Sequence, residues 1–256
     1  MSVRFASLGS GSEGNALIVQ VRESVLMMDC GFGLAETERR LANTGLCPAD
    51  LNAIVVTHEH SDHIGGVARL ARKYAIPVWL THGTATAITI DALDPALLNY
   101  VDPHETFAVG NIHVTPYLVP HDAHEPVQYV FSDGAVRLGV LTDTGTITEH
   151  IENTLSGCEA LVLECNHDLD MLMSGSYPPS LKKRVAGKFG HLDNLAAASL
   201  LRNIDCGKLR HIFAAHLSKQ NNRPEMAQSA LADALSCTPD WIGIAEQRCG
   251  FDWREI

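Results

Sequence analysis

Four side chains of the types that bind divalent cations stand within six residues of one another: His58, His60, Asp62 and His63. They directly follow the apolar run Ala53–Thr57, whose β-branched residues predict a buried strand. In an extended loop, His58 and His60 point to the same side, because side-chain direction alternates along the backbone. Asp62 and His63 then turn toward a second ion where the chain enters a helix. A polar surface loop is the plain alternative, but three histidines and an aspartate packed this tightly favour a metal centre.

Three more ligand-type residues stand at the ends of predicted strands. His121, Asp143 and His216 each come after an apolar run of the strand type. The carboxyl ends of strands are the usual place for sites in proteins that alternate strands and helices. Taken singly, these residues have plain explanations: a surface histidine, a helix-capping aspartate and a histidine bonded at a strand edge. Taken with the cluster, they predict enough ligands for two ions.

The order of predicted elements indicates a mixed α/β fold. Strands are predicted at residues 4–8, 16–21, 25–29, 53–57, 78–81, 112–118, 127–131, 136–141, 161–164 and 209–215, and again near the C-terminal end. Helices are predicted at residues 34–43, 63–75, 196–202 with Asp193 as N-cap, and 224–235. Many strands form neighbouring hairpin-like pairs, which favours two mixed sheets packed together with helices outside. No linker or repeat divides the sequence, so we expect one domain over residues 1–256.

The composition is that of a cytoplasmic globular protein. Hydrophobic residues make up 46% of the 256 residues, enough for a large core without disulfides. The 7 cysteines form no Cys-x-x-Cys pair, which favours a reducing compartment. We expect no signal peptide, no membrane association and no obligate protein partner, while a homodimer is compatible with the sequence. The net charge of -11 argues against broad non-specific nucleic-acid binding but leaves room for a local basic groove.

The motif Thr-His-x-His-x-Asp-His after a buried strand resembles the metallo-β-lactamase superfamily. The other motifs of that family follow in order: Met28-Asp-Cys-Gly31, His121, Thr142-Asp-Thr-Gly145 and His216. The resemblance implies a four-layer αββα sandwich with two metal ions, zinc or manganese, at one edge of the sheets. It implies that one ion is bound by His58, His60 and His121, the other by Asp62, His63 and His216, and that Asp143 bridges them. Asp29 would support a ligand without binding metal.

Within the superfamily the chain is most similar to the YycJ (WalJ)-type exonuclease-like group. Shared segments are Leu8-Gly-Ser-Gly-Ser-Glu-Gly-Asn15, His121-Asp-Ala, Glu164-Cys-Asn-His167, Gly175-Ser-Tyr-Pro178 and Gly190-His-Leu-Asp-Asn194. Ribonuclease Z and the phosphodiesterase PhnP resemble it more distantly. The sequence has no room for the extra domain of ribonuclease J. It also has no Gly-rich arm like that of ribonuclease Z, no cysteine-rich N-terminal motif like that of PhnP, and no added helical domain of the glyoxalase II type.

The resemblance implies a metal-dependent hydrolase, and a phosphodiesterase or nuclease is favoured. Two ions about 3.5–4 Å apart lower the pKa of a bridging water toward about 7 and supply hydroxide at neutral pH. They also neutralise a phosphodiester as negative charge develops in the transition state. The substrate would be DNA, RNA or a small phosphodiester, and exonuclease-like cleavage of nucleic acid is the leading hypothesis. A small-molecule cyclic phosphodiesterase and a thioester or lactone hydrolase remain as alternatives.

Residues outside the ligand set are predicted to act on the substrate. We expect His191 to donate a proton to the leaving group, by similarity to ribonuclease Z, and Asp62 to take part in the chemistry. Glu164 is expected to orient a histidine. The predicted substrate contacts are Ser12, Asn15, His167 and Asn194. The loop from Gly9 to Asn15 could offer backbone N–H groups to a phosphate, or serve only as a tight turn. The basic run Lys182–Lys188 either tracks a phosphate backbone or forms a solvated helix face.

Overall fold

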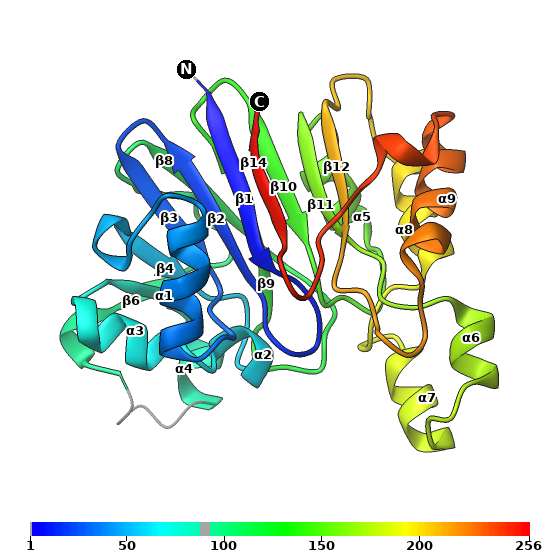
Figure 1. Cartoon of the computed structure of the whole chain (residues 1–256), viewed down its shortest axis with the longest axis horizontal. Helices are drawn as coiled ribbons and strands as arrows, with labels where there is room; N and C mark the ends of the chain where they lie inside the picture. Colours follow the sequence, from blue (N-terminus) through cyan, green and yellow to red (C-terminus); the bar gives the residue numbers. More distant parts are fainter. Residues whose placement is uncertain (1, 88–92) are drawn as a thin grey trace.

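Two sheets of seven strands each carry the fold in the computed structural model, counted over the residues that it describes, 2–87 and 93–256 (Figure 1). The first sheet holds β1 (Val3–Gly9), β2 (Ala16–Val21), β3 (Ser24–Met28), β4 (Ala53–Val55), β5 (Val78–Thr81), β6 (Leu98–Val101) and, beside β1, β14 (Phe251–Glu255). The second holds β7 (Phe107–Val109), β8 (Ile112–Leu118), β9 (Val127–Ser132), β10 (Arg137–Leu141), β11 (Ala160–Glu164), β12 (His211–Ala215) and β13 (Gly243–Ile244).

Each sheet changes from antiparallel to parallel pairing along the chain. Strands β1 to β3 and β7 to β10 pair antiparallel, because short turns join them into hairpins. Strands β3 to β6 and β10 to β13 pair parallel, and most of them are separated by crossover segments that contain helices. Consequently β3 and β4 end at the same edge of the first sheet, and β8, β10, β11 and β12 end at the same edge of the second.

The space between the two sheets is filled by the alternate side chains of their strands. Phe5, Leu26, Tyr129 and Phe131 are each 0% exposed in this layer. Burying one such side chain stabilises the fold by roughly 1.5–3 kcal/mol. The ring of Phe5 also meets Phe213 edge-on at 6.1 Å between centroids. This packing makes the sheet pair a rigid support for side chains at its edge.

Helices cover both outer faces of the sheet pair, which gives the four-layer αββα sandwich that the sequence predicted (Figure 1). On the first sheet lie α1 (Leu34–Asn43), α2 (Ser61–Ile64), α3 (Val67–Tyr74) and α4 (His82–Ala87). The second sheet is covered by α5 (Glu149–Leu155), α8 (Asn194–Asn203) and α9 (Pro224–Leu235). Short 3-10 turns add η1 (Pro48–Asp50), η3 (Pro95–Leu97) and η4 (Pro239–Trp241). In the described part of the chain, no helix has the length and apolar character needed to cross a membrane.

Two further helices, α6 (Leu169–Ser174) and α7 (Pro179–Val185), project beyond the layer formed by α8 and α9 (Figure 1). We call residues 168–189 the arm. Leu169 and Met173 in α6 are 43% and 49% exposed, so this part of the arm packs only one side against the rest of the molecule. Neither helix is among the predicted elements, although a helix face was one interpretation of the basic run, because short helices with one small buried face give little apolar periodicity.

The predicted helix over residues 63–75 is broken into α2 and α3 at Gly65 and Gly66. At Gly66 a Cβ atom would lie 1.9 Å from the carbonyl oxygen of Phe32, so only glycine lets the two backbones approach. The break separates the ligand segment from the amphipathic helix behind it. By contrast, α1 and α9 have the predicted bounds, and the Asp193 side chain caps α8 by accepting from the backbone N–H groups of Leu195 and Ala196.

Candidate metal centre

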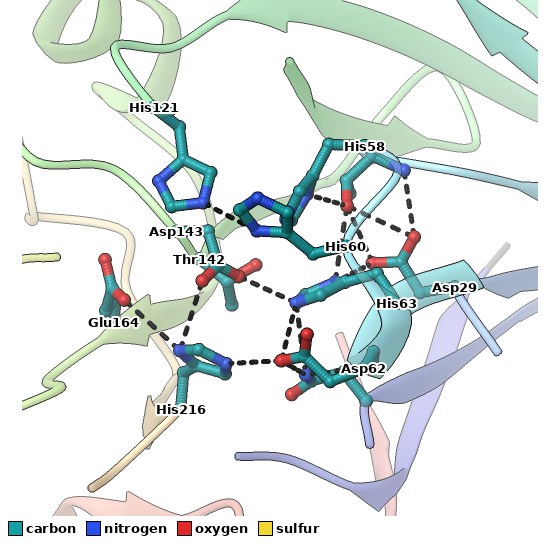
Figure 2. A network of polar contacts seen from close by, with 12 residues as sticks. Asp29, His58, His60, Asp62, His63, His121, Thr142, Asp143, Glu164 and His216 are labelled. Carbon is teal, nitrogen blue, oxygen red and sulfur yellow. Dashed lines mark hydrogen bonds and ion pairs between the residues drawn. The ribbon is translucent and has the colours of Figure 1, made fainter. Parts of the chain in front are cut away.

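The predicted ligands meet at the edge where the strands of both sheets end (Figure 2). The segment that follows β4 carries four of them, and single residues follow β8, β10 and β12. Because these strands end side by side, residues far apart in the sequence come together there. We call this set the metal cluster: His58, His60, Asp62, His63, His121, Asp143 and His216.

Three imidazoles form one half of the metal cluster. One ring nitrogen from each of His58, His60 and His121 lies within 4.8 Å of the others. His121 Nε2 is 3.2 Å from His60 Nδ1, and the rings of His58 and His60 are 4.6 Å apart between centroids. His58 and His121 are buried, whereas the His60 side chain is 29% exposed. This half therefore has one face open to solvent.

The other half of the metal cluster contains a carboxylate. Asp62 Oδ2 lies 3.5 Å from His63 Nε2 and 3.4 Å from His216 Nε2. Asp143 stands between the two halves, with Oδ2 2.9 Å from His63 Nε2 and Oδ1 3.3 Å from His216 Nδ1 (Figure 2). One Asp143 oxygen also lies within 4.8 Å of ligand atoms of His58 and His63. Asp143 can thus reach a cation in either half.

The donor atoms of the metal cluster fit a bound cation. His58 Nε2 is buried and has no hydrogen-bond partner among the described residues, and the buried Asp143 Oδ2 has only its ion-pair contact with His63 Nε2. Burying such atoms without a partner is costly, and a cation would satisfy both. Burial also lowers the pKa of His58, which keeps it in the neutral form that binds metal. Burial alone would raise the pKa of Asp143, but His216 and His63 hold it well below the usual value and so keep the carboxylate ionised.

The histidines in the two halves have different surroundings. Burial lowers the pKa of His121, which faces other imidazoles. Burial alone would also lower the pKa of His216, but the charge of Asp143 and a hydrogen bond with Asp62 raise it to about 9. The half that contains Asp62 is therefore the more negative of the two.

Contacts behind the rings fix the direction of each ligand. His63 Nδ1 lies 2.8 Å from Asp29 Oδ2, and the same carboxylate accepts the Thr57 backbone N–H at 2.8 Å. His121 Nδ1 donates to the Gly190 carbonyl at 3.0 Å. Such contacts set the tautomer of a ligand and typically change metal affinity by about 10–100-fold. Asp29 thus touches the far side of a ligand ring.

Three residues of this region adopt left-handed backbone conformations. The φ angles of Asp29, Asp143 and His216 are 60°, 50° and 55°. This conformation costs roughly 1–2 kcal/mol for a residue with a Cβ, although aspartate tolerates it better than most. Each of the three lies just past the end of a strand, where the turn directs its side chain toward the metal cluster. Aspartate and histidine adopt this conformation more often than most residues, but the sequence does not mark which of them do so.

The loop Gly9–Asn15 packs against the metal cluster, and most of its backbone N–H groups are bonded inside the protein. Its N–H groups are largely used inside the protein, including Gly11 N to Asn15 Oδ1 at 2.8 Å and Glu13 N to Gln247 Oε1 at 2.7 Å. The Asn15 amide lies 3.1 Å from His63 Nε2. The phosphate-binding expectation for this loop is therefore wrong for these N–H groups, because intramolecular partners already occupy them.

His191 lies beside the metal cluster with its Nδ1 directed at carboxylates. Nδ1 is 2.8 Å from Glu164 Oε1 and 3.2 Å from Asp143 Oδ1. Glu164 is fully buried and also accepts the Thr144 backbone N–H at 3.0 Å. Burial opposes the charged ring, but Glu164 and Asp143 raise the pKa of His191 well above the usual value. The His191 Nε2 atom is the ring nitrogen left for a substrate.

A cavity of about 380 Å³ opens over the metal cluster. Its floor includes Asp62, Asp143 and His216, and one wall comes from the arm. The lining residues are Ser12, His60, Ser61, Asp62, Asp122, Asp143, Asn166, Tyr177, Leu181, Arg184, Val185, Gly190, His191, His216 and Ser218. Arg184 Nε donates to Asp122 Oδ2 at 2.6 Å, which holds the guanidinium on this wall.

Of the four predicted substrate contacts, only one lines the cavity. Ser12 lines the cavity, whereas Asn15 is buried beneath it. His167 and Asn194 are 1% and 2% exposed and do not line the cavity. The Asn194 side chain exchanges two hydrogen bonds with the side chain of Asn222, each at 2.9 Å. The direct substrate contacts expected for His167 and Asn194 are therefore not seen in this structure, because neither residue faces the cavity.

Several cavity residues were not predicted. Asp122 and Tyr177 belong to motifs that the sequence shares with the YycJ (WalJ)-type group, but no chemical role was predicted for them. Asn166 and Ser218 lie two residues or fewer from His167 and His216. Their closeness in sequence to His167 and His216 could have suggested them as site residues. Only the folded structure shows that Asn166 and Ser218 face the cavity.

Comparison with known proteins agrees with this geometry. Residues 25–213 match the β-lactamase superfamily domain. The chain therefore belongs to the metallo-β-lactamase superfamily of hydrolases, and its histidine and aspartate cluster is a divalent-metal site.

Two exodeoxyribonucleases are similar to this chain over most of its length. Exodeoxyribonuclease YycJ of Bacillus anthracis is 38% identical over 239 residues, which cover 92% of this chain and 90% of that protein. Exodeoxyribonuclease WalJ of Streptococcus pneumoniae is 31% identical over 245 residues, covering 94% and 91%. Among solved structures, the metallo-β-lactamase fold protein YhfI of Bacillus subtilis superposes with a TM-score of 0.76 over 100% of this chain and 99% of its own, at 17% identity.

Proposed function

We propose that this chain is a nuclease that hydrolyses phosphodiester bonds with two divalent ions. His58, His60 and His121 would hold one ion, and Asp62, His63 and His216 the other, with Asp143 shared. One observation carries the proposal: the metal cluster opens into a cavity whose wall carries the guanidinium of Arg184. A cation on that wall suits an anionic substrate that must reach the cluster.

The ligand chemistry suits zinc or manganese, since both accept imidazole and carboxylate ligands. When bound, the ions supply positive charge for a phosphodiester and lower the pKa of a water molecule. Asp62 has a side chain 21% exposed at the cavity, where its second carboxylate oxygen can orient the attacking water and accept a proton. Asp62 thus combines a ligand role with a part in the chemistry.

His191 supplies the proton that the leaving oxygen needs. Its Nδ1 faces Glu164 and Asp143, which orient the ring, while the side chain is 23% exposed at the cavity. The Glu164 carboxylate is fully buried, so it supports the ring of His191 and cannot itself reach a substrate. Glu164 is accordingly a positioning residue.

Two further facts favour nucleic acid over a smaller ester. Relatives at 38% and 31% identity, matched over nine-tenths of their length, are named exodeoxyribonucleases. In addition, the chain is acidic overall, yet Lys182, Lys183 and Arg184 lie in the last turn of α7, beside the cavity. Local positive charge on an acidic protein favours binding of a nucleic-acid strand at this one site, because the rest of the surface repels the phosphate backbone.

The test is a substrate panel with protein loaded separately with zinc and manganese. We expect release of nucleotides from end-labelled DNA or RNA oligonucleotides and slower turnover of bis(p-nitrophenyl) phosphate. A thioester and a lactone should be hydrolysed poorly. Competition of the chromogenic reaction by single-stranded DNA separates a nuclease from an enzyme for small diesters.

The controls use the metal-stripped protein and an Asp143→Ala variant, both of which should be inactive on every substrate. Preferential turnover of the thioester or lactone would refute a phosphodiesterase. Turnover of the small diester with no competition by DNA would point to a small-molecule phosphodiesterase. Metal analysis that finds one ion per chain in the fully active protein would refute the dinuclear centre.

A further inference from the structure

Phe189, at the end of the arm, has 61% of its surface exposed, more than any other aromatic side chain in the described ranges. A phenyl ring left in water forgoes the stabilisation that burial would give it. Single exposed apolar residues are common on protein surfaces, so exposure alone assigns no role. The place of Phe189 beside the cavity is what distinguishes it.

The backbone around Phe189 is fixed at the cavity rim. The Phe189 carbonyl accepts the N–H of Asp122 at 3.0 Å, and the next carbonyl, that of Gly190, accepts from His121 Nδ1 at 3.0 Å. Asp122 and Gly190 both line the cavity. The backbone of Phe189 is therefore held between two residues of the cavity lining, and the exposed ring projects from the rim next to that lining.

Basic residues lie close to Phe189 in the chain, and one of them, Arg184, is paired with Asp122 at the cavity wall. Lys188 precedes Phe189 and is exposed, and Lys183 and Arg184 are exposed on the adjoining helix α7. Arg184 itself lines the cavity. An aromatic face next to cations that can follow a phosphate backbone is the combination that binds unpaired nucleotides, because every nucleobase has a flat face.

We propose that Phe189 stacks on a nucleobase of the bound strand, while Arg184 and Lys188 contact its phosphates. This inference rests on the nuclease function above and names the substrate more closely: a strand whose terminal base is unpaired. Inside a duplex both faces of a paired base are covered by its neighbours, so a base must be separated from at least one neighbour before it meets the ring. Stacking of this kind tolerates any base, so no sequence preference is expected.

The experiment compares two oligonucleotides of equal length, one with normal bases and one with abasic sites at its terminal positions. For Phe189→Ala we expect KM on the normal oligonucleotide to rise by about 5- to 150-fold, the loss typical of one stacked base. KM on the abasic oligonucleotide and turnover of methyl p-nitrophenyl phosphate should stay at wild-type values. Phe189→Trp should restore KM, whereas Phe189→Leu, apolar but not aromatic, should not.

Trp241→Ala is the matched control. Trp241 is 41% exposed in η4, just before β13, and β13 runs parallel to β12. Trp241 therefore lies near the start of these strands, at the opposite end from His216, and its loss should leave KM unchanged.

Three outcomes would overturn the proposal. Unchanged KM in Phe189→Ala, or an equal rise on normal and abasic oligonucleotides, would show that the ring stacks on no base while the nuclease function stands. A wild-type protein that cleaves the small diester but neither oligonucleotide would refute the nuclease function, and the stacking role with it. Circular dichroism and metal content of each variant establish that it is folded and loaded.

Discussion

The metal cluster and the arm border the same cavity but are built in opposite ways. Residues of the cluster sit on strand ends between two sheets, and five of them are at most 5% exposed. The arm consists of two short helices outside the sandwich (Figure 1), and several of its basic and apolar side chains are exposed. Under the proposed function, chemistry and substrate choice would reside in separate parts of this fold. Changes in the cluster should affect every substrate, and changes in the arm only large ones.

The largest effect is expected from Asp143→Ala. Asp143 stands between both halves of the metal cluster, so its loss should remove most metal from at least one half and lower kcat by at least about 10³-fold, the scale of several kcal/mol of metal stabilisation. Oligonucleotides and small diesters should be affected equally. Elemental analysis and kinetics check this, with Asp233→Ala on the exposed face of α9 as control. Wild-type turnover in Asp143→Ala would rule out the shared position.

His191→Ala should lower kcat on oligonucleotides by about 10²-fold, at the low end for a general acid. It should change turnover of a p-nitrophenyl ester much less, because that leaving group needs no proton. Metal content should stay at the wild-type level, since the Nδ1 atom faces Glu164 and Asp143. Equal losses on both leaving groups, or loss of metal, would contradict the role as proton donor.

Asp29→Asn should weaken metal binding by about 10–100-fold without abolishing activity at saturating metal. The substitution keeps an acceptor for the Thr57 N–H but removes the charge 2.8 Å from His63 Nδ1. A competition titration with a chromophoric chelator measures the affinity, and Asp233→Asn is the control. An affinity equal to that of the wild type would show that the charge behind His63 is dispensable.

The smallest effect is expected from the double substitution Lys183→Ala and Lys188→Ala. If each lysine meets one phosphate, the slope of log affinity against log salt should become shallower by about 1.4 for a single strand. Small-diester turnover should not change. The exposed pair Arg202 and Lys208, replaced by alanine, is the control. Equal losses of activity on the oligonucleotide and the small diester would show that these lysines stabilise the fold and do not bind the substrate.

The sequence predicted the metal cluster better than the arm for a physical reason. Ligand-type residues are rare directly after buried strands, so His121, Asp143 and His216 were visible once their strands were predicted. The two sheets followed from apolar runs of strand length. In the arm, α6 and α7 have six and seven residues, and their small buried faces leave no periodic pattern.

Contacts between distant segments could not be predicted from one sequence. The Asn15 amide meets His63 across 48 residues, and Gln247 fixes the backbone of Glu13 across 234. The break at Gly65 and Gly66 depends on how closely Phe32 approaches, which the amphipathic pattern of residues 67–74 does not reveal. Such contacts explain why the Asn15 amide lies against His63 and not in the cavity lining.

The pairing of β1 with β14, which sets Arg4 opposite Glu255, has a consequence for the order of folding. Joining strands this far apart in the chain carries a large loop-closure entropy, so the pair should form late. The loop Gly9–Asn15 follows β1, and Gln247, just before β14, holds it against the metal cluster. The four predicted ligands in residues 58–63 are neighbours even in an unfolded chain and can bind a metal early. The loop Gly9–Asn15, which packs against them, would reach its place only when β14 pairs with β1. Metal added before refolding should therefore bind an incomplete site and slow the pairing of β1 with β14. Metal added after that pairing should have no such effect.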